Sequence, residues 1–510
     1  MANKFYITTP IYYVNASPHI GHSYTCIAAD SLARHYRQKL GENDVWFLTG
    51  SDEHGQKIQK AADEAKLSPQ EFVDKVVMQF KGLWGKLDIS NNDFIRTTEA
   101  RHIKTVQKVL EILHEKGDIY QDKYEGWYCT PCETFWMELQ LKDGKCPDCG
   151  RSVEKISETN YFFKLKKYQE WLVKYIKDNP NFIRPETRRN EVLSFLALNE
   201  LADLCISRPS ERLGWGIPLP FSPEHVTYVW FDALVNYISA VGSFDAKGKY
   251  SSPWWGPDVN ILHLIGKDIL RQHAIYWPII LHALDIELPK EMTIFAHGWW
   301  LIADAKMSKS KGNVVSPLAM VDKFGIDTYR YFLLRDVPFG MDGNFSEDAI
   351  IKRFNGDLAN DLGNLVYRTL TMIEKYYQGN IPDININNIH AGRAKDIIEK
   401  MKLLPNKNGP LLCAGFDFNF GAVLENIWGL INSANKYVEE TKPWNLAKEN
   451  KTEELKQFIR LLVEVIREVA GAITPFMPRT AESIKEQLGS DKIKKGAPLF
   501  PRIDAKKSNA

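Results

Sequence analysis

The stretch Pro18-His19-Ile20-Gly21-His22 decides the fold of this chain. The short apolar run at residues 5–7 predicts a buried strand, residues 10–17 predict an aromatic loop, and a helical pattern follows from residue 23. A strand, a loop and a helix start in this order form an anion site, because the first amides of a helix are unpaired and carry partial positive charge. Pro18 suits the first helical turn, and His19 and His22 are expected to face the same side of it. The alternative is a pair of surface histidines that cap a helix.

A second stretch lies far downstream, at Lys306-Met307-Ser308-Lys309-Ser310-Lys311-Gly312-Asn313. It follows an apolar run at residues 293–302 and predicts a flexible, positively charged loop. Taken alone, a lysine-rich loop of this kind is better explained as a solvated surface segment. In this order and roughly one nucleotide-binding domain apart, the two stretches resemble the HIGH and KMSKS signatures of class I aminoacyl-tRNA synthetases.

The composition is that of a globular protein with several domains. The chain has 510 residues, of which 44% are hydrophobic and 25% are charged, and its net charge is +1. Single domains hold roughly 100–200 residues, so about three domains are expected. The near-neutral balance argues against a protein that coats nucleic acid indiscriminately, so any contact with RNA is expected to be local. No window reaches the ~18 apolar residues of a membrane span and no signal sequence precedes the first strand, which predicts a cytoplasmic protein without a membrane partner.

Four of the seven cysteines have the spacing of a metal site. Two residues separate Cys129 from Cys132 and two separate Cys146 from Cys149, with thirteen residues between the pairs. Two chelate loops of this kind bring four thiolates into a tetrahedral arrangement, which indicates a Zn²⁺ knuckle. With four protein ligands and no vacancy for water, one structural zinc ion per chain is expected. The alternative is a set of reduced cysteines without metal.

The pattern of strands and helices divides the chain into six segments. Residues 1–115 and 226–305 alternate apolar strands with amphipathic helices, which predicts an α/β fold with the two halves of a Rossmann-type, doubly wound parallel sheet. Residues 116–225 break this rhythm and carry the zinc knuckle, so they are expected to be an insertion. Residues 306–349 predict the lysine loop and a small α+β segment. Residues 350–490 predict an all-α bundle, and residues 491–510 an extended, lysine-rich tail.

Beyond the two signatures, the chain is similar to methionyl-tRNA synthetases along nearly its whole length. The resemblance rests on residues 9–22 (TPIYYVNASPHIGH), 228–233 (YVWFDA), 265–268 (IGKD), 305–313 (AKMSKSKGN) and 442–444 (KPW). It implies that the insertion is a connective peptide domain, that residues 306–349 contact the stem of tRNA, and that the helical bundle binds the anticodon.

The resemblance also implies which residues bind the small substrates. Asp52 would bind the α-ammonium of L-methionine, although an N-cap for the next helix is an alternative for this residue. A polarisable thioether is attracted to aromatic edges, and its pocket would be lined by Tyr13, Trp230, Ala233, Leu234, Tyr237, Ile269 and His273. Leu234 stands where some family members carry proline, and core packing is the alternative for each aromatic residue. ATP, with Mg²⁺ on its phosphates, would be bound by Asn15, His19, Gly21, His22, Gly266, Asp268, Lys306, Ser308 and Lys309.

The implied reaction has two steps. Methionine and ATP give methionyl-adenylate and pyrophosphate, and methionine then passes to the terminal ribose of initiator or elongator tRNA(Met) with release of AMP. Both nucleophiles belong to the substrates, so the protein is expected to position them and to stabilise charge. His19 and His22 would contact the phosphates, while Lys306 and Lys309 would neutralise the leaving pyrophosphate.

For the anticodon, the resemblance implies Trp444 as a platform on which a base stacks, with Asn364 and Arg368 as polar readers. The alternative for Trp444 is a side chain that packs against the start of its helix after Pro443. The chain ends at Ala510 without an appended domain, which predicts a monomer. Two other functions remain open: a synthetase for cysteine or another apolar amino acid, and a regulatory RNA-binding relative, which would be expected to lose the histidines or lysines.

Overall fold

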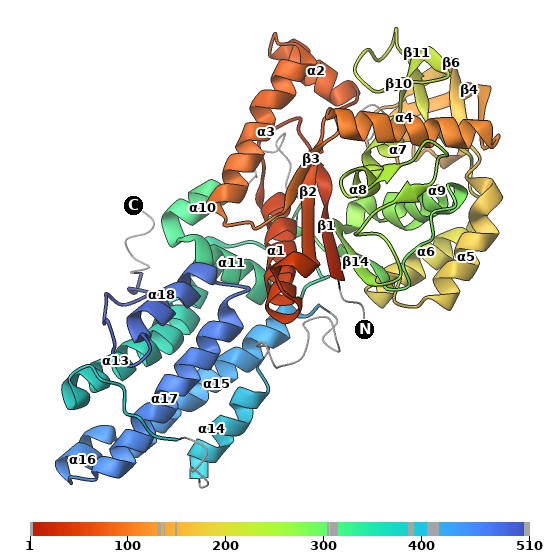
Figure 1. Cartoon of the computed structure of the whole chain (residues 1–510). Coiled ribbons are helices and arrows are strands. Elements are labelled where there is room, and N and C mark those ends of the chain that lie inside the picture. Colours follow the sequence, from red (N-terminus) through yellow and green to blue (C-terminus); the bar gives the residue numbers. More distant parts are fainter. Residues whose placement is uncertain are drawn as a thin grey trace. The chain divides into compact units, whose positions relative to one another are not determined.

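The computed structural model describes residues 4–129, 134–136, 138–147, 150–302, 305–306, 315–385, 392–404 and 418–503. The chain divides into two compact units (Figure 1). Unit 1 comprises Met1–Ala29 and Asp44–His297, and unit 2 comprises Asp30–Asn43 and Gly298–Ala510. Within the described part of the chain, no helix combines the length and the apolar character that crossing a membrane requires.

A six-stranded parallel sheet forms the centre of unit 1, in the order β3-β2-β1-β14-β15-β7. Its strands are β1 (Lys4–Tyr13), β2 (Val45–Asp52), β3 (Asp93–Arg96), β7 (Ile183–Arg184), β14 (Val259–Gly266) and β15 (Met292–His297). The central strands are almost continuously buried, as expected for a parallel sheet with helices on both faces. The direction of strand succession reverses between β1 and β14, and ligands of such sheets bind at the carboxyl ends beside this point. The predicted doubly wound sheet is confirmed.

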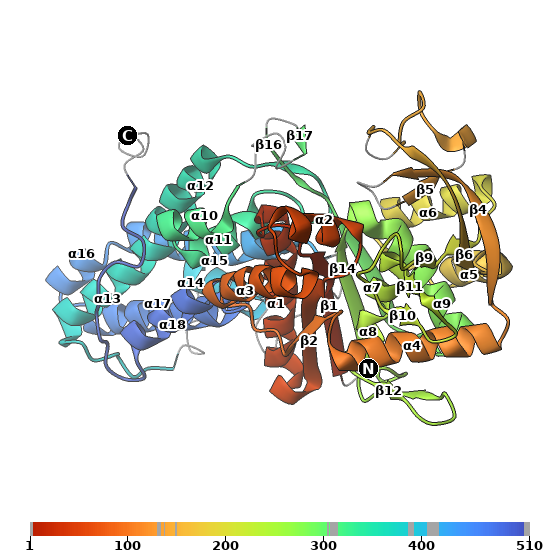
Figure 2. The same cartoon turned by 90° about the horizontal axis from the view of Figure 1, so that it is seen from above.

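Helices surround this sheet (Figures 1 and 2). They are α1 (Ile20–Leu40), which continues from unit 1 into unit 2, α2 (Gln56–Glu64), α3 (Pro69–Lys86), α4 (Ala100–Glu115), α5 (Gln169–Asp178), α6 (Glu186–Leu198), α7 (Val229–Leu234), α8 (Asn236–Ser239) and α9 (Trp277–Ala283). A 3₁₀ turn (Lys267–Ile269) and a π-helix (Gln272–Tyr276) connect β14 to α9. Helix α4 illustrates the packing: Val106, Val109, Leu110 and Leu113 recur at helical spacing and are buried in the core.

The range predicted as an insertion holds most of the antiparallel structure of unit 1. One sheet has the order β5-β4-β6-β8, formed by β4 (Ile119–Cys129), β5 (Thr134–Trp136), β6 (Glu154–Phe163) and β8 (Leu204–Cys205), and Figure 2 shows β4 beside β6. A smaller sheet contains β9 (Ser207–Pro209), β10 (Pro218–Leu219) and β11 (Ser222–Thr227), and a hairpin joins β12 (Ser243–Phe244) to β13 (Tyr250–Ser251). Strand β7 lies in the same sequence range but pairs with β15 in the main sheet, a contribution that its two residues did not reveal in the sequence.

Unit 2 consists mainly of helices. A small sheet, β17-β16-β18, is formed by β16 (Trp300–Ile302), β17 (Ala305–Lys306) and β18 (Gly343–Asn344). The helices are α10 (Pro317–Phe324), α11 (Ile326–Arg335), α12 (Glu347–Arg353), a π-helix (Phe354–Gly363), α13 (Asn364–Tyr377), α14 (Gly392–Lys402), α15 (Phe420–Thr441), α16 (Pro443–Lys448), α17 (Thr452–Ile473) and α18 (Pro478–Leu488). Helix α17 packs against α13, α14, α15, α16 and α18. The predicted helical bundle is thus confirmed.

Candidate active site

The carboxyl end of β1 differs in detail from the sequence prediction. The strand continues to Tyr13, although its register with β2 shifts between Thr8 and Ile11. The predicted loop therefore begins after Tyr13, because residues 11–13 pair with residues 50–52 beyond the irregularity. Helix α1 begins at Ile20, so Pro18 precedes the first turn and does not belong to it.

His19 and His22 lie together at the start of α1, as predicted. Their rings stack with centroids 3.8 Å apart. The Gly21 amide donates to His19 Nδ1 at 3.1 Å, and the His19 amide donates to His22 Nδ1 at 3.2 Å. Because both Nδ1 atoms accept, each neutral ring carries its hydrogen on Nε2. Two Nε2–H donors at one helix start can bind the oxygens of a phosphate chain.

The backbone at this helix start is less open than the sequence indicated. The first amides of the helix were expected to be unpaired donors of an anion site, but the His19 ring accepts the hydrogen bond of the Gly21 amide. A Cβ atom at Gly21 would lie 3.0 Å from Cε1 of His19, so glycine allows the imidazole to fold back onto the helix. His19 thus acts as a cap for the first turn.

Tyr13 and Asp52 end two neighbouring strands and face each other in register. The Val14 amide donates to the Asp52 carbonyl at 3.2 Å, which joins the two chain segments just beyond the sheet. Asp52 is buried, and the N-cap of α2 is Gly55. The alternative role of Asp52 as a helix cap is therefore wrong, because the chain continues for three residues before α2 starts.

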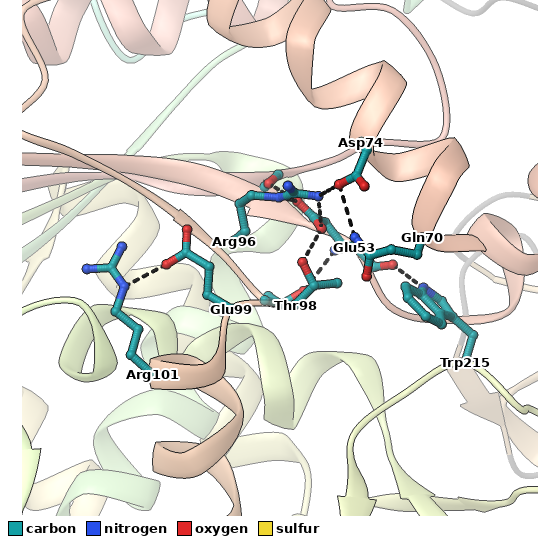
Figure 3. Close-up of polar contacts among 10 residues, drawn as sticks. Glu53, Gln70, Asp74, Arg96, Thr98, Glu99, Arg101 and Trp215 are labelled. Atoms are coloured by element: carbon teal, nitrogen blue, oxygen red, sulfur yellow. Dashed lines mark hydrogen bonds and ion pairs between the residues drawn. The ribbon is translucent and has the colours of Figure 1, made fainter. Parts of the chain in front are cut away.

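The residue after Asp52 is held by a dense set of hydrogen bonds, which Figure 3 shows in part. Glu53 is fully buried, and its carboxylate accepts bonds from Arg96 Nε at 2.7 Å and Nη2 at 2.9 Å. Ser51 Oγ at 2.5 Å and Thr98 Oγ1 at 2.6 Å donate to the same carboxylate. The ionised side chain is thereby fully paired in the interior, and the chain that carries Asp52 is anchored to the end of β3.

A second buried network follows at His54. Its Nδ1 lies 2.6 Å from Asp232 Oδ2, while Nε2 of His102 lies 2.7 Å from Asp232 Oδ1. His102 Nδ1 lies 2.8 Å from Ser239 Oγ. Burial alone would raise the pKa of Asp232, but the contacts with His54 and His102 outweigh it and lower this pKa to about 2. A buried carboxylate therefore bridges two imidazoles from different parts of the chain.

Apart from Tyr13 on β1, the residues predicted for the methionine side chain lie on α7, on α8 and in the segment after β14. Helix α7 carries Trp230, Ala233 and Leu234, helix α8 carries Tyr237, and the segment after β14 carries Ile269 and His273. The Tyr237 hydroxyl lies 2.7 Å from His273 Nε2, and His273 Nδ1 lies 2.8 Å from the Ile269 carbonyl. The contacts thus bring Tyr237, Ile269 and His273 together, while Trp230 is half-buried and Ala233 and Leu234 are buried.

The hydrogen bonds of His273 define its state. A carbonyl only accepts, so Nδ1 carries the hydrogen and the Tyr237 hydroxyl donates to Nε2. Burial lowers the pKa of His273 to about 4, and the ring is therefore neutral near pH 7. These two side chains form an uncharged wall, which suits an apolar thioether better than a charged substrate group.

Three of the residues predicted for the nucleotide lie at or just after the ends of β1 and β14, the two strands that flank the reversal in strand order. Asn15 is exposed after β1, Gly266 ends β14, and Asp268 is exposed in the 3₁₀ turn that follows. Lys306 is the last residue of β17, whereas Ser308 and Lys309 lie outside the described residues.

The remaining predicted sites are described in part. Cys129, at the end of β4, and Cys146 are buried thiols, while Cys132 and Cys149 lie outside the described residues. The described residues alone contain no cluster of three or more potential metal-ligating side chains. Asn364 is exposed at the start of α13 and Arg368 is half-buried one turn later. Trp444 on α16 has 44% of its surface exposed.

Sequence reasoning missed the residues that support this site, namely Glu53, His54, Arg96, His102 and Asp232. One signal was present: Asp232 is an acidic residue within the apolar stretch VWFDALV, and charged residues are rarely buried without a partner. The identity of that partner was not visible, since His54 and His102 lie 178 and 130 residues away.

Two family models and several known proteins match this chain in sequence. The family model described as tRNA synthetases class I (M) matches residues 5–155 and 149–370. The model described as the anticodon binding domain of methionyl tRNA ligase matches residues 420–500. The methionine-tRNA ligase of Clostridium acetobutylicum is 49% identical over 523 residues, which cover 99% of this chain and 79% of that protein. The methionine-tRNA ligase of Bacillus subtilis is 44% identical over 540 residues, which cover 100% of this chain and 79% of that protein.

A solved structure agrees with these sequence matches. Methionyl-tRNA synthetase from Mycobacterium tuberculosis, in complex with methionyl-adenylate, aligns with a TM-score of 0.90 and 39% identity. The alignment covers 98% of this chain and 100% of that chain. By two family models and by relatives that match nearly its whole length, this chain belongs to the methionyl-tRNA synthetases, the class I ligases that join methionine to tRNA.

Proposed function

We propose that the carboxyl ends of β1, β2 and β14 carry the ATP-dependent methionine-tRNA ligase reaction of this chain. The observation that carries the proposal is the stacked pair His19 and His22, which lies at a helix start beside the reversal in strand order. The relative from M. tuberculosis, which shares the fold over 98% of this chain, was solved with methionyl-adenylate.

In the first step, a carboxylate oxygen of methionine attacks the α-phosphorus of ATP. A new P–O bond forms, the bond to pyrophosphate breaks, and its electron pair leaves with pyrophosphate. Asp52 binds the α-ammonium, while His19 and His22 donate to phosphate oxygens as negative charge shifts onto the leaving group. Lys306 and Lys309 neutralise that group, and Asn15, Gly21, Gly266, Asp268 and Ser308 hold the nucleotide.

In the second step, a hydroxyl of the terminal ribose of tRNA attacks the acyl carbon of the adenylate. The ester bond forms, the acyl–phosphate bond breaks, and AMP leaves. No nucleophile from the protein is required in either step, so the rate depends on positioning and on charge stabilisation.

The pocket for the methionine side chain is formed by Tyr13, Trp230, Ala233, Leu234, Tyr237, Ile269 and His273. The neutral His273 and its partner Tyr237 support this assignment, because an uncharged aromatic wall attracts a thioether without the cost of leaving a charge unpaired. Close analogues of methionine fit such a pocket almost as well as methionine does. We therefore expect the pocket to discriminate against them by about 1–3 kcal/mol per differing group.

Two metal ions are part of the proposal. Zn²⁺ is bound by Cys129, Cys132, Cys146 and Cys149, and the two described members of this set are buried thiols, the donor type that zinc prefers. This ion links two loops of the chain and has no role in the reaction. Mg²⁺ accompanies the phosphates of ATP.

For tRNA, we assign anticodon reading to Trp444, Asn364 and Arg368 in the bundle. The exposed face of Trp444 supports this assignment, since base stacking requires an accessible indole. Residues 116–225 act as the connective peptide and residues 306–349 as the segment that contacts the tRNA stem. The monomeric state and the cytoplasmic location stay predictions.

The test is ATP–pyrophosphate exchange with each of the twenty amino acids, without tRNA. Exchange driven by methionine alone is the expected result. Exchange driven by another amino acid, or no exchange either with or without tRNA(Met), would overturn the proposal. Charging of tRNA(Met) under the same conditions then measures the second step separately.

A further inference from the structure

Asp232 is the centre of a buried network that connects four elements of unit 1. Its two carboxylate oxygens contact His54, in the loop after β2, and His102 on α4. His102 in turn contacts Ser239 on α8, and Asp232 itself lies on α7. All four side chains are buried. We propose that Asp232 is a positioning residue that sets the separation between the ammonium end and the side-chain end of the methionine site.

Asp232 and the two histidines that it contacts, His54 and His102, form a bridge, and the chemistry of these contacts makes it rigid. An ionised carboxylate only accepts hydrogen bonds, so His54 carries a hydrogen on Nδ1 and His102 carries one on Nε2. Each oxygen of Asp232 is used by a different imidazole, at 2.6 and 2.7 Å. In the buried interior, such charge-assisted bonds are stronger than neutral ones and an unpaired charge is costly. Movement of α7 relative to the loop after β2 would break at least one of them.

The bridge joins the two ends of the proposed methionine site. His54 lies two residues after Asp52, and Glu53 between them is clamped by Arg96, while Trp215 Nε1 donates to the Glu53 carbonyl at 2.5 Å. The backbone that carries Asp52 is therefore held from several directions. On the other side of the bridge, Trp230 and Ala233 lie on the same short helix as Asp232.

The consequence is a fixed distance between the group that binds the ammonium and the wall that contacts the thioether. A ligand gains from both ends only if its length matches this distance, so the network contributes to the selectivity for methionine. This inference rests on the proposed function, because it assumes that Asp52 and α7 contact the same ligand. It predicts that loss of Asp232 impairs the binding of methionine and spares the binding of ATP.

The principal test compares Asp232→Asn with Asp118→Asn in the full chain. Asp118 is a matched control: its carboxylate is also buried and paired, with Lys167 at 2.6 Å and Tyr168 at 2.7 Å. In ATP–pyrophosphate exchange, Asp232→Asn is expected to raise the KM for methionine about tenfold or more and to change the KM for ATP less than about twofold. Asp118→Asn is expected to leave the KM for methionine and the KM for ATP at their wild-type values. Equal increases in both KM values, or the same increase in the control variant, would overturn the proposal.

A second pair of variants covers the case in which Asp232→Asn does not fold. The amide nitrogen of His102→Gln can donate to Asp232 in place of Nε2, whereas His102→Leu cannot. The glutamine variant is expected to retain most of the methionine affinity and the leucine variant to lose it. Equal methionine affinity in the two variants would refute the role of the bridge.

Calorimetry provides a readout that does not depend on turnover. The ligands are L-methionine and 4-(methylthio)butanoate, which lacks the amino group. Asp232→Asn is expected to reduce the preference for methionine over this analogue, because Asp52 is no longer held opposite the pocket. An unchanged preference in a folded Asp232→Asn variant would refute the positioning role alone. A wild-type chain without exchange driven by methionine would instead refute the proposed function.

Discussion

Replacing Arg96 with methionine measures how far the buried carboxylate of Glu53 depends on its charged partner (Figure 3). Glu53 is fully buried and accepts two bonds from Arg96, at 2.7 and 2.9 Å. Methionine retains part of the aliphatic stem, but only the hydroxyls of Ser51 and Thr98 then remain to balance the charge. Removing one partner of a buried ion pair lowers the free energy of unfolding by about 3–5 kcal/mol. Against a typical stability of about 5–15 kcal/mol, this loss is large.

Arg101→Met is the matched control for this experiment. Arg101 contacts the carboxylates of Asp93 at 2.7 Å and Glu99 at 2.6 Å, but 41% of its side chain is exposed. Exposed pairs contribute about 0–1 kcal/mol, so a small change is expected.

Urea unfolding followed by circular dichroism reports both variants. Arg96→Met is expected to shift the midpoint far more than Arg101→Met. The double variant Glu53→Gln/Arg96→Met is expected to regain part of the loss, because the unpaired charge is gone. Equal midpoints for the two arginine variants, or no recovery in the double variant, would refute the reasoning.

Further predictions concern the pocket, the anticodon and the lysine loop. Tyr237→Phe leaves Nε2 of His273 without its donor and is expected to weaken methionine binding by about 1–3 kcal/mol in calorimetry; unchanged binding would contradict the assignment. Because the pKa of His273 is lowered to about 4, the unfolded chain binds this proton below about pH 6.5 and the folded chain does not, so stability is lost as the pH falls from 6.5 toward 4, on the order of 3 kcal/mol. Urea midpoints measured across this pH range should decline less steeply for His273→Gln than for the wild-type chain. Identical slopes in the two proteins would contradict the predicted loss of stability at low pH. Trp444→Ala is expected to abolish charging of tRNA(Met) while exchange survives, and loss of both activities would favour a packing role. Lys309→Ala is expected to lower the rate of adenylate formation far more than methionine affinity, and equal losses in both would exclude its role with pyrophosphate.

The main sheet was predictable from local patterns, but the ends of its strands were not. The apolar run at residues 5–7 predicted β1, yet β1 continues to Tyr13 and β2 continues to Asp52, both of which are predicted site residues. The loop predicted over residues 10–17 placed the end of β1 before Pro10, a residue that is rare inside strands. Gly50 is in the strand because a Cβ atom there would collide with the backbone of Ile95 on β3, a constraint set by the neighbouring strand.

In the candidate site, too, some features were predictable from the local sequence and others were set by the tertiary structure. The proximity of His19 and His22 was predictable from their three-residue separation, although His19 precedes the helix and the stacking of the two rings was not predicted. The capture of the Gly21 amide by His19 was not, because it depends on the rotamer of the ring and not on residue type. The role of Gly55 as the cap of α2 likewise required the observed course of the chain after Asp52.

By itself, the sequence determined the alternation of strands and helices in the main sheet, the two signature stretches and the family, because apolar periodicity and motif residues can be read from short stretches of the chain. Only the tertiary structure decided which buried polar groups are partners. Asp232 meets His54 and His102, and Glu53 meets Arg96, across separations that no local pattern records. A buried charge must find a partner wherever folding brings one within hydrogen-bond distance, and that distance is set by the packing of the whole unit.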